Sequence, residues 1–162
     1  MIGNLVRLLC KCVLFTKHRI FACIVTFNVS HTSFLYSRHL SLRAFRPATC
    51  YIEPEFATVG DLSGGKDVDV YSASLEHNDR AILDGDKEGY VKIFCKKGTG
   101  TIIGCCIIAG RAGELINEVT LAMKHGISLD GIGRNIHCYP TTGESVMGCG
   151  LQIINSKWKL LK

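Results

Sequence analysis

Acidic residues are missing from the first third of the chain. Residues 1–50 contain no Asp or Glu, although the 162-residue sequence has 14 of them. Seven of the 19 Lys and Arg residues lie in the same segment, which leaves 12 basic against 14 acidic side chains in residues 51–162. Binding of nucleic acid needs a basic patch on the folded domain, with residues that read or stack on bases. Residues 51–162 show neither, and we expect no nucleic-acid partner.

Residues 1–45 have the composition of a segment outside the fold. Basic residues combined with Ser, Thr and apolar runs are typical of an organelle-targeting presequence. A disordered segment or a mis-assigned start of the reading frame would also fit, and a membrane span at 20–37 is the third interpretation. Polar residues such as Asn28 and His31 argue against the span, because a span needs about 20 mainly apolar residues. A genuine presequence predicts a mitochondrion or another organelle, and otherwise we expect the cytoplasm.

The chain also lacks the paired cysteines and glycines of common redox and nucleotide sites. No C-x-x-C, C-x-x-x-x-C or G-x-G-x-x-G occurs in it, so neither a redox disulfide nor a dinucleotide-binding turn is predicted. Residues 60–67 nearly match the phosphate-binding loop G-x-x-x-x-G-K-[ST]. Asp67, however, stands where that motif needs a hydroxyl for magnesium. We expect a plain glycine-rich loop followed by a strand.

The nine cysteines are an odd set and lie in apolar runs rather than in loops. This favours free buried thiols in a reducing compartment over a disulfide scaffold. Adjacent side chains on a strand point to opposite faces, so Cys105 and Cys106 are expected to be two core thiols. His137, Cys138 and Cys149 lack the spacing of a zinc site, and no metal site is expected. A small thiol or metal protein using Cys105, Cys106 and Cys138 stays as a third functional hypothesis.

Apolar periodicity predicts strands in the first part of the domain. Pro54 removes an amide donor and ends the first of them. Residues 78–89 are polar and are expected to form turns at Gly85 and Gly89, and residues 96–100 have the length of a hairpin link. The expected strands are 49–52, 68–75, 90–95 and 101–109. The last of these is continuously apolar, which is typical of a central strand covered on both faces.

After the last predicted strand, the hydrophobic period changes to that of a helix. An apolar stripe predicts a helix that ends at Gly126, and Ser128 or Asp130 is placed to cap a short turn after it. A final helix is expected to open at Thr141 or Thr142. Strands followed by helices, with hairpin links, predict an α+β domain with a mainly antiparallel sheet.

A tyrosine and a glutamate stand five residues apart across Pro140, at the start of the last expected helix. One interpretation is structural: Glu144 suits the positive end of the helix dipole, and Tyr139 is semi-buried. The other is functional: Tyr139 handles a proton or contacts a ligand, and the carboxylate positions it, as in acid–base sites. Nothing else in the chain supplies a cofactor site or a nucleophile pair, so this turn is the candidate edge of an active site.

Several segments, taken in order, resemble one known domain. They are 51–60 (YIEPEFATVG), 78–81 (NDRA), 89–93 (GYVKI), 101–104 (TIIG) and 112–118 (AGELINE). From about Arg46 to Trp158 the chain is similar to the C-terminal dimerisation domain of the FAD-dependent pyridine nucleotide-disulfide oxidoreductases. The resemblance implies that residues 46–162 form an antiparallel sheet of four to five strands with helices on one side, with 1–45 outside the fold.

The resemblance also assigns roles to the tyrosine and the glutamate. In most of this family a closing H-P-T-x-x-E motif supplies a His, oriented by the Glu, to the flavin–disulfide site of the other subunit. Here Tyr139 stands at the His position, and Pro140, Thr141 and Glu144 match. Tyr139 and Glu144 are therefore implied to be catalytic in trans. A Tyr at this position is what mercuric reductase and its near relatives carry, which favours that branch, although Cys138 replaces their first proline.

The FAD domain, the NAD(P) domain and the redox disulfide of the family have no counterpart in these 162 residues. The resemblance implies FAD and NAD(P) for a whole enzyme. For this chain alone, which resembles only the last third of such an enzyme, we expect no bound cofactor and no catalysis. The expected partner is a second copy in a homodimer, or a full-length homologue. The alternative function is a free-standing dimerisation or interaction module without catalysis.

Overall fold

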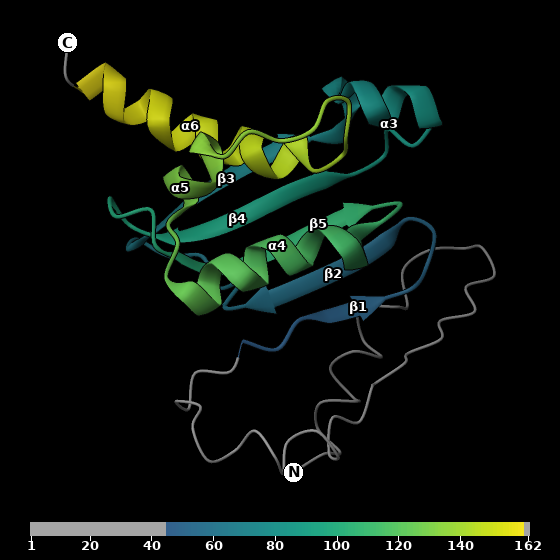
Figure 1. Ribbon diagram of the computed structural model, residues 1–162. Helices are drawn as coiled ribbons and strands as arrows, with labels where there is room; N and C mark the ends of the chain where they lie inside the picture. The colour runs from purple at the N-terminus through teal and green to yellow at the C-terminus, as the bar shows by residue number, and fades with distance from the viewer. Residues whose placement is uncertain (1–44, 161–162) are drawn as a thin grey trace, which may run out of the picture.

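An open five-stranded antiparallel sheet forms the centre of the protein (Figure 1). The computed structural model describes residues 45–160, so the expectations for a presequence, a mis-assigned start or a span at 20–37 lie outside the described residues. The strands are β1 (Ala48–Cys50), β2 (Glu55–Gly60), β3 (Val68–Ser74), β4 (Tyr90–Lys96) and β5 (Ile102–Ala109), in the order β1-β2-β5-β4-β3. The antiparallel sheet of the predicted α+β domain is thereby confirmed.

Strand β5 occupies the central position that its continuous apolar sequence predicts. Ile107 pairs with Ala57 of β2 on one side and with Val91 of β4 on the other, and all three side chains are fully buried. Burial of an aliphatic side chain of this size stabilises a fold by about 1.5–3 kcal/mol. The hairpin link after β4 is also confirmed, because Lys96 N donates to Thr101 O at 2.8 Å.

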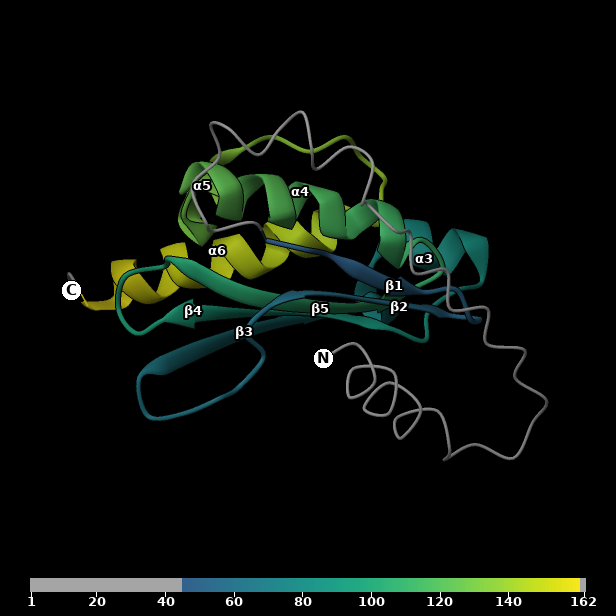
Figure 2. The same ribbon diagram turned by 90° about the horizontal axis from the view of Figure 1, so that it is seen from below.

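Three helices cover one face of the sheet (Figure 2). Helix α4 (Ala112–His125) packs on β2 and β5, and α6 (Glu144–Leu160) packs on β3 and β4 and against α5 (Leu129–Arg134). Gly126 ends α4 in the left-handed conformation, with φ of 68°, as predicted. No helix within residues 45–160 is long and apolar enough to cross a bilayer.

Two segments differ from the periodicity analysis. Residues 78–89 are not all turn, because Asn78 caps a short helix, α3 (Asp79–Asp84), which Gly85 ends with φ of 74°. Six residues are too few for an apolar period to show. The strand predicted at 49–52 corresponds to β1, which ends two residues earlier, at Cys50. A separate strand, β2, begins directly after Pro54. Strand β2 is therefore a fifth strand that periodicity did not predict.

The loop at 60–67 behaves as a plain connection. It leads from β2 into β3, whereas a phosphate-binding loop leads into a helix. Asp61 Oδ1 accepts from Ser63 N at 2.9 Å, which closes the first turn of the loop. Gly60 has φ of 74°, and a Cβ there would lie 2.2 Å from Ile103 O. This glycine therefore serves a backbone crossing, and the expected loop followed by a strand is confirmed.

Candidate functional site

The turn before α6 carries Tyr139 on its surface and lies beside α3 (Figure 1). The Tyr139 hydroxyl donates to Asp79 Oδ2 at 2.8 Å, although 60 residues separate the two in the chain. The Tyr139 side chain is 72% exposed. The structural interpretation made Tyr139 semi-buried, and this part of it is wrong, because the ring lies on the surface and only its hydroxyl is held.

Glu144 holds the turn rather than the tyrosine hydroxyl. Its Oε2 accepts from the backbone N of Thr141 at 2.9 Å, and it is the first residue of α6. A glutamate that reaches back three residues to an amide is half of a capping box. The sequence predicted that this helix opens at Thr141 or Thr142, and α6 begins two to three residues later, at Glu144. The geometry thus gives Glu144 the helix-start role of the structural interpretation, while Asp79 contacts the tyrosine.

Asn78 joins α3 to this turn from a buried position. Its side chain is 8% exposed, and Nδ2 donates to Thr141 O at 3.0 Å and to Ser145 Oγ at 3.3 Å. Its Oδ1 accepts from Ala81 N at 3.0 Å, as an N-cap does. One buried amide therefore caps α3, holds the backbone of the turn and contacts α6. Because a buried polar group left without partners is costly, this arrangement favours a single position of the turn.

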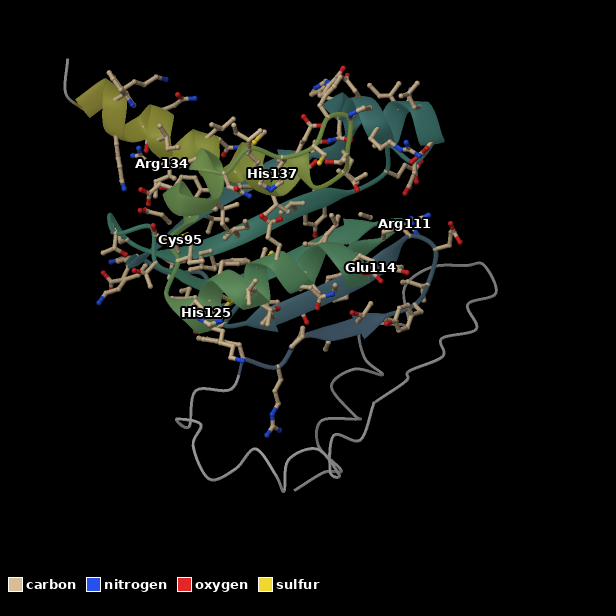
Figure 3. The ribbon with its side chains drawn as sticks, viewed as in Figure 1. Cys95, Arg111, Glu114, His125, Arg134 and His137 are labelled. Atoms are coloured by element: carbon tan, nitrogen blue, oxygen red, sulfur yellow. The ribbon has the colours of Figure 1, made fainter. Side chains whose placement is uncertain are left out.

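His137 attaches the same segment to α4. Its Nε2 lies 2.9 Å from Glu118 Oε1, and its Nδ1 lies 3.0 Å from Asn135 O. Figure 3 shows the imidazole directed toward α4. Both neighbours of the ring accept hydrogen bonds, so His137 serves as a donor that anchors the backbone next to Tyr139.

The tyrosine is a weak acid in this setting. The hydrogen bond to Asp79 and the negative charge of that carboxylate raise the pKa of Tyr139 above its ordinary value, with smaller effects from burial and from Glu144. A phenol with a raised pKa stays protonated at neutral pH and is a poor general base. Tyr139 therefore provides a neutral, oriented hydroxyl on an exposed edge.

The comparisons with known proteins agree with this architecture. A profile of the pyridine nucleotide-disulphide oxidoreductase dimerisation domain matches residues 46–148. The chain belongs to this family.

Dihydrolipoyl dehydrogenases are among the similar proteins of known sequence. That of Trypanosoma brucei brucei is 35% identical over 118 residues, which cover 67% of this chain and 25% of that protein. That of Bacillus subtilis is 31% identical over 121 residues, which cover 72% of this chain and 26% of that protein. The dimerisation domain described here thus spans about a quarter of the length of these relatives.

Solved structures show the same fold. LpdA from Mycobacterium tuberculosis superposes with a TM-score of 0.67 at 26% identity, over 76% of this chain and 28% of that one. The flavoprotein disulfide reductase RclA from Escherichia coli superposes with a TM-score of 0.62 at 21% identity, over 72% of this chain and 28% of that one. At that identity RclA supports the fold alone.

The surface hollow at the start of α4 is poorly suited to the pyrophosphate of a dinucleotide. It has a volume of about 530 Å³ and lies at the N-terminal end of α4, where Figure 3 shows Arg111 and Glu114. The carboxylates of Glu55 and Glu114 line it and would oppose a pyrophosphate. Gly113 N, an amide that a phosphate would need, already donates to Glu55 Oε2 at 2.9 Å. Neither Tyr139 nor Glu144 lines this hollow.

The cysteine pair of β5 consists of core thiols, as predicted. Cys105 and Cys106 are buried, and burial raises the pKa of both. Cys138, in contrast, is exposed. Among residues 45–160 no three His, Cys, Asp or Glu side chains gather as metal ligands would. The hypothesis of a thiol or metal site using Cys105, Cys106 and Cys138 therefore has no geometric support.

The buried thiols predict a loss of stability at high pH. Burial raises the pKa of Cys95 and of Cys149 from 9.0 to about 12. Between these values the unfolded chain releases thiol protons that the folded chain retains, so the free energy of unfolding falls as pH rises. Each thiol contributes up to about 1.4 kcal/mol per pH unit. Denaturant unfolding at pH 8 to 11 measures this slope.

The matched control for the alkaline slope is Cys149→Ala, because lysines and tyrosines also titrate in that range. The variant should have a shallower slope than the wild type. An unchanged slope would show that the Cys149 thiol is not a source of the pH dependence.

Sequence reasoning did not assign Asn78, Asp79 or Glu118 to the site. Asn followed by Asp before Ala81 and Ile82 is a recognisable helix-start signal, and a search for short capped helices would have found α3. That Asp79 meets Tyr139 has no local signal, because the contact depends on how the β3–β4 connection and the turn before α6 lie in the fold.

Proposed function

We propose that this dimerisation domain completes the flavin site of a partner subunit with Tyr139 and Glu144. The observation that supports it is an exposed aromatic edge on a firmly held segment. Ile136 is 93% and Tyr139 is 72% exposed, while His137, between them, is bonded to α4 and Asn78 holds the following turn. Exposed apolar side chains on a fixed backbone are suited to docking, because little conformational entropy is lost on binding.

The tyrosine and the glutamate take different parts in this proposal. Tyr139 presents the neutral hydroxyl to the partner's site, and Glu144 keeps the turn in place through Thr141 N. A phenol of raised pKa does not replace the imidazole of an H-P-T-x-x-E motif as a base at neutral pH. This favours a tyrosine-bearing branch of the family of the mercuric reductase type over dithiol chemistry that needs a base.

The proposed partner is a second copy joined to the remaining domains, or a full-length homologue that carries FAD and NAD(P). A family domain of this kind has a dimer surface, which provides the reason for pairing. The alternative is a free-standing module that occupies this surface of a homologue without catalysis. The two differ in whether pairing leaves the partner's reductase activity intact.

Size measurement tests the pairing. The purified chain is run alone and with the dihydrolipoyl dehydrogenase of Bacillus subtilis on a sizing column with light scattering. We expect a dimer or a mixed complex, and Tyr139→Ala should weaken it about tenfold or more if the ring is central to the contact. Ile127→Asp, on an exposed residue after α4, is the matched control. A strict monomer in both runs would reject the proposal.

Absorbance tests the expectation that the flavin belongs to the partner. Oxidised flavin bound by redox proteins absorbs at about 450 nm. The chain alone should show no such band. A stoichiometric band in the purified chain would contradict it. In the mixed complex, retained NAD(P)H-dependent activity that Tyr139→Phe lowers supports completion of the site, and lost activity supports the non-catalytic module.

A further inference from the structure

We propose that Asp79 is the positioning residue of Tyr139, in the place that the family pattern assigns to Glu144. This inference rests on the proposed function for the importance of Tyr139, but its geometry stands by itself. Asp79 Oδ2 accepts the Tyr139 hydroxyl hydrogen at 2.8 Å. Glu144 is occupied by Thr141 N and does not contact the hydroxyl.

The frame around Asp79 fixes where its carboxylate lies. Asp79 is the first residue of α3, and Asn78 before it is buried and bonded to Thr141 O and Ser145 Oγ. The residue that caps α3 therefore also holds the turn that carries Tyr139. Because these bonds hold the start of α3 against the turn before α6, they keep the Asp79 carboxylate next to the Tyr139 hydroxyl.

The neighbouring charges leave Asp79 available for the tyrosine. Arg80, the next residue, directs its Nε to Asp84 Oδ2 at 2.8 Å, one helical turn away. The carboxylates that act on the Tyr139 hydroxyl are Asp79 from α3 and, more weakly, Glu144 from α6. Both are negative, and the phenol donates its one hydrogen to Asp79.

The direction of this hydrogen bond determines whether the Tyr139 hydroxyl can donate a further hydrogen bond to a partner or accept one from it. A tyrosine hydroxyl has one hydrogen, and here it is donated to Asp79. The remaining capacity of the oxygen is to accept. Tyr139 held by Asp79 thus presents an acceptor to a hydrogen-bond donor of the partner, such as a thiol or an amide. A carboxylate on the other side of the hydroxyl also increases the negative character of the oxygen and strengthens that bond.

Titration of the tyrosine in the full chain tests the proposal. The alkaline absorbance change of Tyr139 is obtained as the difference between each protein and the same protein carrying Tyr139→Phe. We expect Asp79→Asn to lower the midpoint relative to the wild type, and Glu144→Gln to lower it less. Asp84→Asn, a carboxylate of the same helix that bonds to Arg80 instead, is the matched control and should leave the midpoint unchanged.

The outcomes separate positioning from a merely structural effect. Asp79 is exposed, so circular dichroism and denaturant unfolding should show Asp79→Asn folded. An unchanged midpoint in Asp79→Asn, or a larger decrease in Glu144→Gln, overturns the proposal. Because the titration uses this chain alone, a lowered midpoint upholds the role of Asp79 even when pairing with a homologue fails. Pairing with an unchanged midpoint would instead uphold the proposed function and reject Asp79.

Discussion

Gly150→Ala is expected to destabilise the domain by about 3 kcal/mol, the upper range for overpacking a tight interior contact. Gly150 of α6 crosses Gly133 of α5 with backbone against backbone. A Cβ on Gly150 would lie 2.5 Å from Gly133 N and 2.7 Å from Leu129 O, and a Cβ on Gly133 would lie 2.5 Å from Gly150 C. These are main-chain atoms that no change of rotamer moves away, so the two helices must separate and lose packing.

Gly148→Ala is the matched control for this crossing, because it places the same methyl group on the same helix. Its Cβ would meet only the Ala73 Cβ, at 3.9 Å, which is ordinary van der Waals contact. Alanine favours a helix over glycine by up to about 1 kcal/mol, so this variant should be as stable as the wild type or more stable. Urea unfolding of both variants measures the difference, and similar losses in both would contradict the close helix contact.

Asn78→Ala is expected to cost about 2–4 kcal/mol of unfolding free energy and to release the turn that carries Tyr139. Loss of the N-cap bond to Ala81 N accounts for about 1 kcal/mol. Thr141 O and Ser145 Oγ lose a buried partner as well, and unsatisfied buried groups cost about 1–3 kcal/mol. The midpoint of the Tyr139 titration should then move in the same direction as in Asp79→Asn, because the register between α3 and the turn is lost.

Asn78→Asp separates the two functions of this residue. Aspartate keeps an oxygen that caps α3, but it has no amide hydrogens for Thr141 O and Ser145 Oγ. In denaturant unfolding, we expect a free energy of unfolding between that of the wild type and that of Asn78→Ala. Ile136→Ala is the control in the same segment: its side chain is almost fully exposed, so it should change the free energy of unfolding by less than about 0.5 kcal/mol. Full stability of Asn78→Asp would show that the bonds to the turn contribute little.

The main elements of the sheet follow from short-range patterns in the sequence. The alternation at 68–75 and 90–95 and the continuous apolar run at 101–109 correspond to β3, β4 and β5 because side chains on a strand alternate between two faces. The helix that ends at Gly126 was predicted for a similar reason, since its apolar stripe has the helical period. The short helix α3 has too few residues for such a pattern, and its cap residue was the only signal.

The candidate site divides in the same way. The sequence by itself placed Tyr139 across a proline from Glu144 at the start of a helix, and the motifs in order identified the family. Which carboxylate holds the tyrosine was decided only by the tertiary structure. Glu144, near in sequence, turns back to a backbone amide that the first turn of a helix leaves unpaired. Asp79, 60 residues away, reaches the hydroxyl because the β3–β4 connection and the turn before α6 meet in the fold.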